Sequence, residues 1–322
     1  MKKVKLSTKI AAVGIALVVV AGALFVGGMS LLDWDFRKLD NTVWTAKEYA
    51  PETETTVLTS AVIDCDSSYV KIEKGDSLAI QYEESDKVKY EVECEGGTLT
   101  VRERRLFKFT MFDFHTPKMS IVLPSTASLS VNAVNGDLEI NDNSFVELNI
   151  DIVNCDMYFD GIEVAQSAII ETVNGNVTLH NMTVGNLRAN SINGDIKATE
   201  VTVKNYAELG TVNGDVSAIK FTAANVKFET VNGDVYTEEL AARECELGTV
   251  NGEIESRDNQ TRDWSAETVN GSINANFKGE EREYRIECHT VNGSKNMHDR
   301  EDGEKSITAE TVNGDIGIWF SH

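Results

Sequence analysis

Proline is scarce in this 322-residue chain, and basic residues are outnumbered by acidic ones. Three prolines and 23 glycines exclude a collagen-like or proline-rich low-complexity chain. There are 30 lysines and arginines against 52 aspartates and glutamates, which gives a formal net charge of -22. Because phosphate binding needs clustered Lys and Arg, nucleic acid is not expected as a partner. The 41% share of hydrophobic residues is typical of a globular protein that buries a core.

Motifs of common catalytic and metal sites are also missing. The CxxC or Cys/His spacing of a zinc site does not occur, and neither does a GxSxG elbow, a Walker loop or a dinucleotide fingerprint. The histidines are isolated: His115, His180, His289, His298 and His322. These absences favour a non-enzymatic protein. They leave an enzyme open, because catalytic groups assemble in space rather than in sequence.

One long apolar run lies near the N-terminus. Residues 10–32, IAAVGIALVVVAGALFVGGMSLL, contain no charged side chain, and about 20 such residues span a bilayer as a helix. Lysines in residues 1–9 precede the run, and Asp33 and Asp35 follow it, so the positive-inside rule predicts a cytoplasmic tail and an extracytoplasmic remainder. Ala21-Gly22-Ala23 resembles a cleavage site, but the apolar residues after it favour an uncleaved anchor. We therefore expect a single-pass protein of the cell membrane.

Residues 33–60 show no clear period and are interpreted as a linker. Beyond them, apolar and polar residues alternate, with KGDS and EGGT as turn signals, which predicts a β-meander cap over residues 61–128. Cys65 and Cys94 are placed on neighbouring strands of this region, where a disulfide is feasible in an oxidising compartment. A Phe-rich patch, expected to cover one end of the core, consists of Phe107, Phe109, Phe112 and Phe114.

A repeat of 19 to 22 residues occupies residues 129–322. Its marker is an asparagine that follows Val or Ile in all ten copies and precedes Gly in nine. Residues four and six positions before the asparagine are apolar, which is the period of a strand with one buried face. One such unit cannot bury its apolar face alone, but stacked units can. The sequence therefore predicts an all-β chain with a β-solenoid of about ten coils, right-handed as parallel crossovers usually are. The marker residues are Asn135, Asn154, Asn174, Asn193, Asn213, Asn232, Asn251, Asn270, Asn292 and Asn313.

We interpret the repeated Val-Asn-Gly as a structural corner. Glycine adopts positive φ without steric cost, and asparagines stacked about 4.8 Å apart are expected to bond to one another. The Thr or Ser two positions before each asparagine is expected to pair its hydroxyl across coils. Cys155 replaces a corner glycine and is the best candidate for an exposed thiol, whereas Cys245 and Cys288 occupy inward columns and are expected to be buried.

An acidic column stands two residues after the marker asparagine. Like charges about 4.8 Å apart repel by around 1 kcal/mol per pair even at the dielectric of water. The carboxylates must therefore splay into solvent or share cations. Carboxylate oxygens suit Ca²⁺, so a calcium ladder is the alternative to solvated side chains; no other cofactor is indicated. The four consecutive members of this candidate metal site are Asp195, Asp215, Asp234 and Glu253.

The order of segments carries a family resemblance. VKIEKGDSLAIQYEESDKVKYEVECEGGTLTV, then MSIVLPSTASLSVNAVNGDLEI, then the run of xTVNGDV units resembles the bacterial "putative adhesin" family with β-strand repeats, which includes LiaG-like membrane proteins of envelope-stress operons. The resemblance spans residues 61–318. It implies an all-β solenoid, often behind a membrane anchor in Gram-positive bacteria, with a surface or envelope role and no known catalytic residues. Cys155, Lys295 and the longer coils between Asn251 and Asn313 depart from the pattern, and such irregular coils can hold a binding site.

These observations predict a membrane-anchored, extracytoplasmic module for adhesion, scaffolding or envelope stress, with a cell-surface or envelope component as partner. A polymerising β-helix is the alternative, because the last coil, ending at Ile318, Trp319 and Phe320, is an open edge unless the aromatics cover it. A polysaccharide-active enzyme is less favoured, because nearly constant coil length leaves little room for a cleft. The ligand and the oligomeric state stay open.

Overall fold

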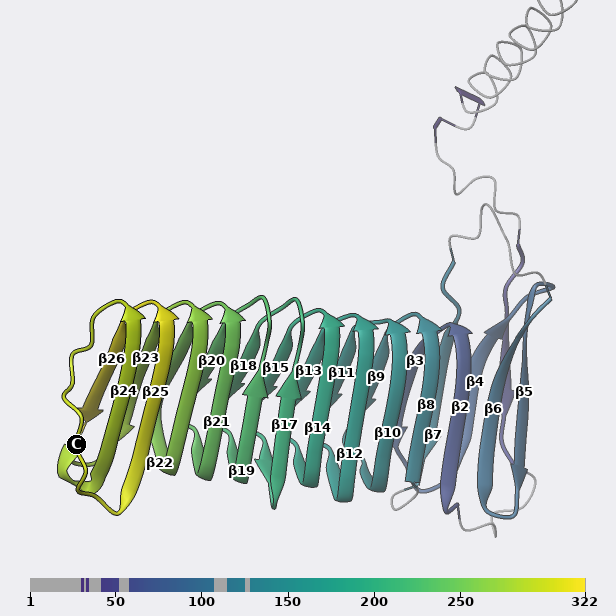
Figure 1. The fold of residues 1–322 in the computed structure, drawn as a ribbon. Helices are drawn as coiled ribbons and strands as arrows, with labels where there is room; N and C mark the ends of the chain where they lie inside the picture. Colours follow the sequence, from purple (N-terminus) through teal and green to yellow (C-terminus); the bar gives the residue numbers. More distant parts are fainter. Residues whose placement is uncertain are drawn as a thin grey trace, which may run out of the picture.

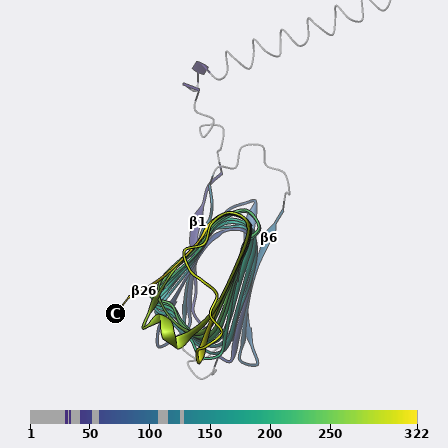
Figure 2. The ribbon, with the colours of Figure 1, turned by 60° about the vertical axis from the view of Figure 1, so that its left-hand side comes forward.

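Two narrow β-sheets, A and B, lie face to face and are joined coil by coil. A computed structural model describes residues 30–31, 33–34, 42–51, 58–106, 115–124 and 128–321 (Figure 1). The chain runs up sheet B, over the asparagine corner and down sheet A behind it, and the coils up to residue 278 are each displaced further along the axis, which is a right-handed course. Figure 2 shows the coils superposed as a flattened ring. The predicted all-β solenoid is confirmed, with about nine turns.

Several expectations fall on residues outside those ranges. The predicted cytoplasmic tail at 1–9, nearly all of the predicted anchor at 10–32 and the Phe-rich patch lie there. Within the ranges that the structure covers, no helix has the length and apolar character needed to cross a bilayer.

Sheet A contains short strands that follow each asparagine corner. They pair in parallel along the solenoid, and two antiparallel strands, β4 and β1, complete the sheet beyond β7. In spatial order the strands are β1 (Thr45–Tyr49), β4 (Ala79–Glu84), β7 (Lys118–Leu123), β3 (Tyr69–Lys74), β9 (Leu138–Asn141), β11 (Met157–Asp160), β13 (Val177–His180), β15 (Ile196–Thr199), β18 (Val216–Ile219), β20 (Val235–Glu238), the start of β22 (Ile254–Asn270), β23 (Ile273–Lys278) and β26 (Ile316–Ser321).

Sheet B contains the longer strands that lead into the corners. Their register aligns asparagine with asparagine from coil to coil. In spatial order they are β5 (Val88–Glu95), β6 (Thr98–Arg105), β2 (Ser60–Ser67), β8 (Ser128–Asn135), β10 (Ser144–Asn154), β12 (Glu163–Asn174), β14 (Thr183–Asn193), the interrupted pair β16 (Thr202–Val203) and β17 (Tyr206–Gly210), β19 (Thr222–Glu229), β21 (Ala241–Asn251), the end of β22, β25 (Lys305–Asn313) and β24 (Tyr284–Asn292). A short 3-10 helix, η2, covers Glu281–Glu283.

The core lies between the sheets and follows the period of two. Residues four and six positions before each asparagine point inward, as Phe228 and Val226 do, and the third residue after it closes the other side, as Val235 does. Removal of this aliphatic and aromatic surface from water stabilises the stack by about 25 cal/mol per Å². No coil has a closed core of its own, so each depends on its neighbours.

The N-terminal strands differ from a simple meander. β2 and β3 already form a solenoid coil, since they pair in parallel with β8 and β9, and the antiparallel pairs β5–β6 and β4–β7 lie beyond them. The expectation for the two cysteines was wrong, because β6 separates Cys65 on β2 from Cys94 on β5. Both are free thiols.

The C-terminal coils do not stack in chain order. β25 lies between β22 and β24, so the last coil of the chain is inserted between the two coils that precede it in sequence. The spacings between asparagines are longer here because the chain must pass over one coil position and return to it. Loops 279–283 and 293–304 contain the additional residues. The outermost strand of sheet B is therefore β24, not the terminal coil that we expected, while β26 forms the edge of sheet A.

Candidate functional site

The asparagine corner carries a continuous hydrogen-bond ladder. In nine of the ten corner asparagines, all but Asn135, Nδ2 donates to the Oδ1 of the adjacent corner asparagine at 2.7–2.9 Å. The ladder follows the spatial order of the coils, since Asn313 donates to Asn270 and Asn292 donates to Asn313. Asparagine suits this role because one amide carries both a donor and an acceptor. The predicted ladder of all ten asparagines is confirmed.

Glycine follows the asparagine mainly because the coils approach closely there. A Cβ built on Gly233 would lie 1.9 Å from the carbonyl oxygen of Gly214, and the same collision recurs along the corner. Positive φ, which the sequence suggested as the reason, is secondary: φ of Gly233 is 157°, close to extended backbone. Neighbouring backbone thus excludes a side chain at these glycines, and Cys155, the one exception in the repeat, has a different backbone conformation.

The threonine column forms a second ladder of a different kind from the one expected. Thr230 Oγ1 donates to the carbonyl oxygen of Gly214 at 2.8 Å, and the pattern repeats in other coils, so the hydroxyls bond to backbone rather than to one another. Thr172, one coil beyond Cys155, is an exception, because its buried hydroxyl has no hydrogen-bond partner among the described residues.

Cys155 itself is buried, which makes the exposed-thiol prediction wrong. Its side chain is 3% exposed, and its backbone does not have the positive φ of Gly175 or Gly194. Burial raises the pKa of the thiol to about 12, so it stays protonated near neutral pH. Cys245 and Cys288 are buried as predicted.

The acidic column is tied to the backbone of the next coil. Oδ1 of Asp215 accepts the backbone N–H of Asp234 at 2.8 Å, and Oδ1 of Asp234 accepts that of Glu253 at 2.7 Å. The N–H of Asp215 bonds to Asp195 at 3.1 Å in the same way. Each bond offsets part of the repulsion between stacked carboxylates. No group of three or more Cys, His, Asp and Glu side chains in the described parts of the chain is arranged to hold a metal ion, so calcium binding stays a prediction.

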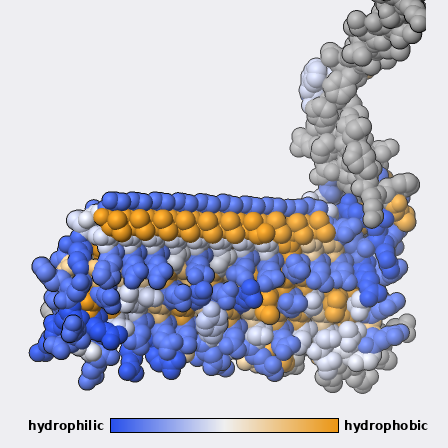
Figure 3. All heavy atoms as spheres, viewed as in Figure 1, coloured by the Kyte–Doolittle hydropathy of each residue, from blue (hydrophilic) through white to orange (hydrophobic). Residues whose placement is uncertain are grey.

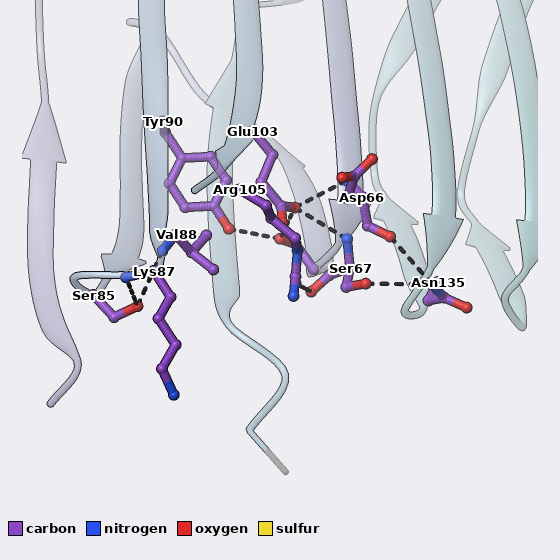
Figure 4. A network of polar contacts seen from close by, with 10 residues as sticks. Asp66, Ser67, Ser85, Lys87, Val88, Tyr90, Glu103, Arg105 and Asn135 are labelled. Atoms are coloured by element: carbon purple, nitrogen blue, oxygen red, sulfur yellow. Dashed lines mark hydrogen bonds and ion pairs between the residues drawn. The ribbon is translucent and has the colours of Figure 1, made fainter. Parts of the chain in front are cut away.

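A buried carboxylate ends these ladders on the N-terminal side. Glu103, from β6, accepts the backbone N–H groups of Asp66 and Ser67 at 3.0 and 3.1 Å and the hydroxyl of Ser68 at 2.9 Å (Figure 4). Arg105 donates to its second oxygen at 2.7 Å. This coil has Ser67 in place of the asparagine, and Asn135 donates to it at 3.3 Å. A short motif search misses this cap, because Glu103 comes from a distant strand.

An exposed aliphatic stripe runs beside the asparagine ladder. The residue before each asparagine lies on the outer surface of sheet B, and Figure 3 shows these side chains as an orange band under a blue row along the corner. Large exposed apolar surface in a continuous band marks an interaction site. The stripe consists of Val134, Val153, Val173, Ile192, Val212, Val231, Val250, Val269, Val291 and Val312, which are 36–74% exposed.

A shallow groove accompanies the stripe on sheet B. Its volume is about 830 Å³, and it extends from Asn190 to Val312. Gly210 and Gly248 leave its floor low in two coils, while Glu229 and Glu267 supply negative charge. The sequence revealed the column of Val and Ile but not its exposure. An apolar residue that faces outward recurs every 19 to 22 residues just as an inward one does, so the repeat alone does not separate the two.

A second corner, which the sequence did not reveal, lies seven residues after each of the first seven marker asparagines. Its residues have φ between 46° and 66° although most are not glycine. Backbone N–H groups bond to the next coil there, as Glu239 does to the carbonyl of Arg257 at 3.0 Å. The members are Asp142, Gly161, Asn181, Glu200, Lys220, Glu239 and Asp258.

Polar side chains occupy the outer edges at the C-terminal end. The amide of Asn296 bonds to both the N–H and the carbonyl of Ile318 on β26, each at 2.9 Å. On β24, Asp299 accepts the N–H of Cys288 at 3.1 Å, and Lys295 donates to the Cys288 carbonyl at 2.7 Å. The ammonium of Lys295 beside Asp299 lowers the pKa of that carboxyl. These side chains, together with backbone bonds from the same loop to Ile316 and Ile286, thus take the place of a further strand.

The stacked coils and corner ladders define a β-solenoid in which the repeated residues hold neighbouring coils together. A family model described as Toastrack DUF4097 matches residues 59–318, and the chain belongs to that family. This confirms the family resemblance seen in the sequence. A search of curated proteins found no match.

Three solved bacterial structures are similar to the chain. A "putative adhesin" from Parabacteroides distasonis is 14% identical over 87% of this chain and 98% of that one, with a TM-score of 0.48. A "putative adhesin" from Bacteroides fragilis is 18% identical over 86% and 97%, with a TM-score of 0.42. A "putative lipid binding protein" from Parabacteroides distasonis is 18% identical over 88% and 98%, with a TM-score of 0.43.

Proposed function

We propose that the chain is a non-enzymatic adhesion or scaffold module that residues 10–32 anchor in the cell membrane, with the solenoid outside the cell. The observation that carries this proposal is the aliphatic stripe, one Val or Ile per coil, exposed along the whole array. Repetition of a weak contact along a rigid solenoid gives a partner many simultaneous contacts. A role in envelope stress would use the same displayed surface.

The partner that fits this surface is an extended chain with apolar and basic groups. Nine steps of about 4.8 Å between ten stripe residues make a band about 43 Å long, which suits an extended segment better than a compact ligand. The stripe supplies apolar contact, and Glu208, Glu229, Glu267 and Glu310 beside it favour positive charge. The formal charge of -22 adds long-range attraction for such a partner.

The polymerising alternative has a specific observation against it. Asn296, Lys295 and Asp299 already bond to the backbone of β26 and β24, where an added coil would have to pair. Natural β-proteins use such side chains to prevent edge-to-edge association. We therefore favour display of a lateral surface over end-to-end assembly.

Calorimetry with a defined peptide tests the binding surface. The full chain in detergent micelles is titrated with a synthetic peptide of alternating Lys and Val. In the test variant Val212, Val231 and Val250 are each changed to Thr, which keeps the shape and β-propensity but removes apolar surface. We expect affinity to fall about tenfold or more, while the control Ile169→Thr, exposed on sheet B outside the stripe, binds as the wild type. Equal affinity in all three proteins contradicts the assignment of the stripe.

A second measurement tests the location. An antibody against a C-terminal tag should label intact cells that express the full chain, because the proposal places the solenoid outside. Labelling that requires permeabilised cells would refute the proposed orientation.

Calcium binding by the acidic column is tested separately. Titration of the full chain with CaCl₂ is compared with a variant that carries Asp195→Asn, Asp215→Asn and Asp234→Asn. Saturable binding that the substitutions abolish would establish the metal site. Absence of heat in both proteins would leave the column with the backbone contacts described above.

A further inference from the structure

A half-exposed tryptophan lies on the outer face of sheet A near the C-terminal end. Trp319 on β26 is 49% exposed and pairs in register with Asn276 on β23. Its indole lies over Gly317, since a Cβ at that glycine would come within 2.1 Å of the ring. One face of the ring therefore packs along the strand, which leaves the tryptophan as a flat apolar plate on a polar sheet.

Hollows lie on both sides of this plate. The first, of about 340 Å³, is lined by Glu255, Arg257 and Asn274 among others. The second, of about 730 Å³, is lined by residues that include Arg282 and Asn296. Trp319 borders both hollows, so a ligand longer than one ring can pass over it.

The first hollow is built by an irregular coil rather than by a loose loop. The register between β22 and β23 shifts between Ser256 and Asn259. The side chain of Asn259 is fully buried, and its Nδ2 donates to the carbonyls of Ser256 and Asn276 at 3.0 and 2.9 Å. These bonds hold the shifted strands at a fixed separation. The sequence singled out this stretch as irregular, and the structure shows what the irregularity forms.

Polar side chains beside Trp319 have hydrogen-bond donors and acceptors that are not used within the protein. Arg257 donates through Nε and Nη2 to Oε1 of Glu255 at 2.8 and 2.5 Å and lies 5.5 Å from the ring centre of Tyr236. Within the described residues, Nη1 of Arg257, Oε2 of Glu255 and the amide of Asn274 have no hydrogen-bond partner. The carboxylates of Glu238 and Asp258 also line this hollow, which disfavours an anionic ligand.

We propose that this surface binds a neutral oligosaccharide. A pyranose ring has an apolar C–H face that stacks on an aromatic plate, and its hydroxyls both donate and accept hydrogen bonds at the ring edge. Trp319 provides the plate, while Glu255, Arg257 and Asn274 provide the edge contacts. The site lies on sheet A, so it does not depend on the aliphatic stripe of sheet B.

Tryptophan fluorescence and saturation-transfer NMR of the full chain test this assignment with three probes: cellotetraose, maltotetraose and tetra-N-acetylchitotetraose. Trp264 is buried, so a blue shift on binding reports chiefly on the exposed rings. We expect at least one probe to bind saturably. Trp319→Ala should weaken it about tenfold or more, and Tyr158→Ala, an exposed aromatic elsewhere on sheet A, should leave it unchanged.

A second variant guards against loss of structure. Asn274→Ala removes a side chain that holds no other group in place, and it should weaken the same probe severalfold with unchanged thermal unfolding. Val212→Thr should have no effect on saccharide binding, which separates this site from the stripe. The proposal is overturned if none of the probes saturates, or if Trp319→Ala and Asn274→Ala bind as the wild type does.

Discussion

Each coil of the solenoid turns at two corners, and the two are built differently. At the asparagine corner, side chains bond from coil to coil and backbone approaches backbone closely enough to exclude a Cβ. At the second corner backbone N–H groups bond from coil to coil, and the exposed side chains add a single ion pair among the described residues, from Lys220 to Glu200 at 2.9 Å. The asparagine corner therefore demands particular residues, whereas the second corner demands only a positive φ.

The largest contrast is expected at glycine. Gly233→Ala places a Cβ 1.9 Å from the Gly214 carbonyl oxygen, which forces two coils apart. We expect a loss of about 3 kcal/mol or more in unfolding free energy, measured by denaturant titration. Gly96→Ala is the control, since its φ is 59° but nothing lies within 4 Å of the added Cβ, and it should cost only about 1 kcal/mol. Equal losses would show that close approach is not the constraint.

Loss of a central asparagine comes next. Asn232→Ala removes two ladder bonds, one to Asn213 and one from Asn251, and should cost about 1–2 kcal/mol. Asn292, at the end of the ladder, makes one such bond, so Asn292→Ala should cost about half as much. Thermal unfolding of both variants measures the difference. A larger effect at Asn292 would argue against a ladder that stabilises through each bond.

Two substitutions in the threonine column are expected to change the free energy of unfolding differently. Thr230→Val removes the bond to the Gly214 carbonyl without changing the shape of the side chain, and should cost about 1 kcal/mol. Thr172→Val removes a buried hydroxyl that no described residue bonds to, so it should be neutral or stabilising. Both are measured by denaturant unfolding under the same conditions. Destabilisation of similar size at the two sites would contradict the assigned role of the hydroxyls.

The smallest effect is expected at the second corner. Glu239→Gly relieves a residue with φ of 52°, and the gain is partly offset by the greater freedom of glycine in the unfolded chain. We expect a net gain of about 0.5 kcal/mol in thermal unfolding. Glu246→Gly, within a strand, should lose a similar amount, so the two changes differ in sign. Destabilisation by both would indicate that the Glu239 side chain contributes contacts of its own.

The contrast between corners explains what the sequence predicts and what it does not. A residue recurs in sequence where its side chain meets its own copy in the next coil, as Asn213 meets Asn232, so the solenoid, its register and the ladder follow from the repeat. Backbone conformation leaves a weaker trace, since Lys220 and Glu239 share one φ but no chemistry.

Contacts between distant segments leave no periodic trace. The insertion of β25 between β22 and β24 and the cap at Glu103 join segments far apart in the chain, and neither repeats. The repeat in the sequence also does not show that the stripe is exposed, for another reason. Val231 faces solvent and Val235 faces the core, yet the first column is apolar in all ten copies and the second in nine.

Hydrogen exchange at the corner asparagines tests the central claim most directly. In each bonded asparagine one side-chain amide proton is donated to the neighbouring coil and the other faces solvent, so NMR of the full chain in detergent should show one slowly and one rapidly exchanging proton in each of these amides. Asn135, whose donor contacts to Ser67 and Asp66 are longer at 3.3 and 3.5 Å, should be the least protected. Rapid exchange of both protons throughout the column would contradict a ladder that joins the coils.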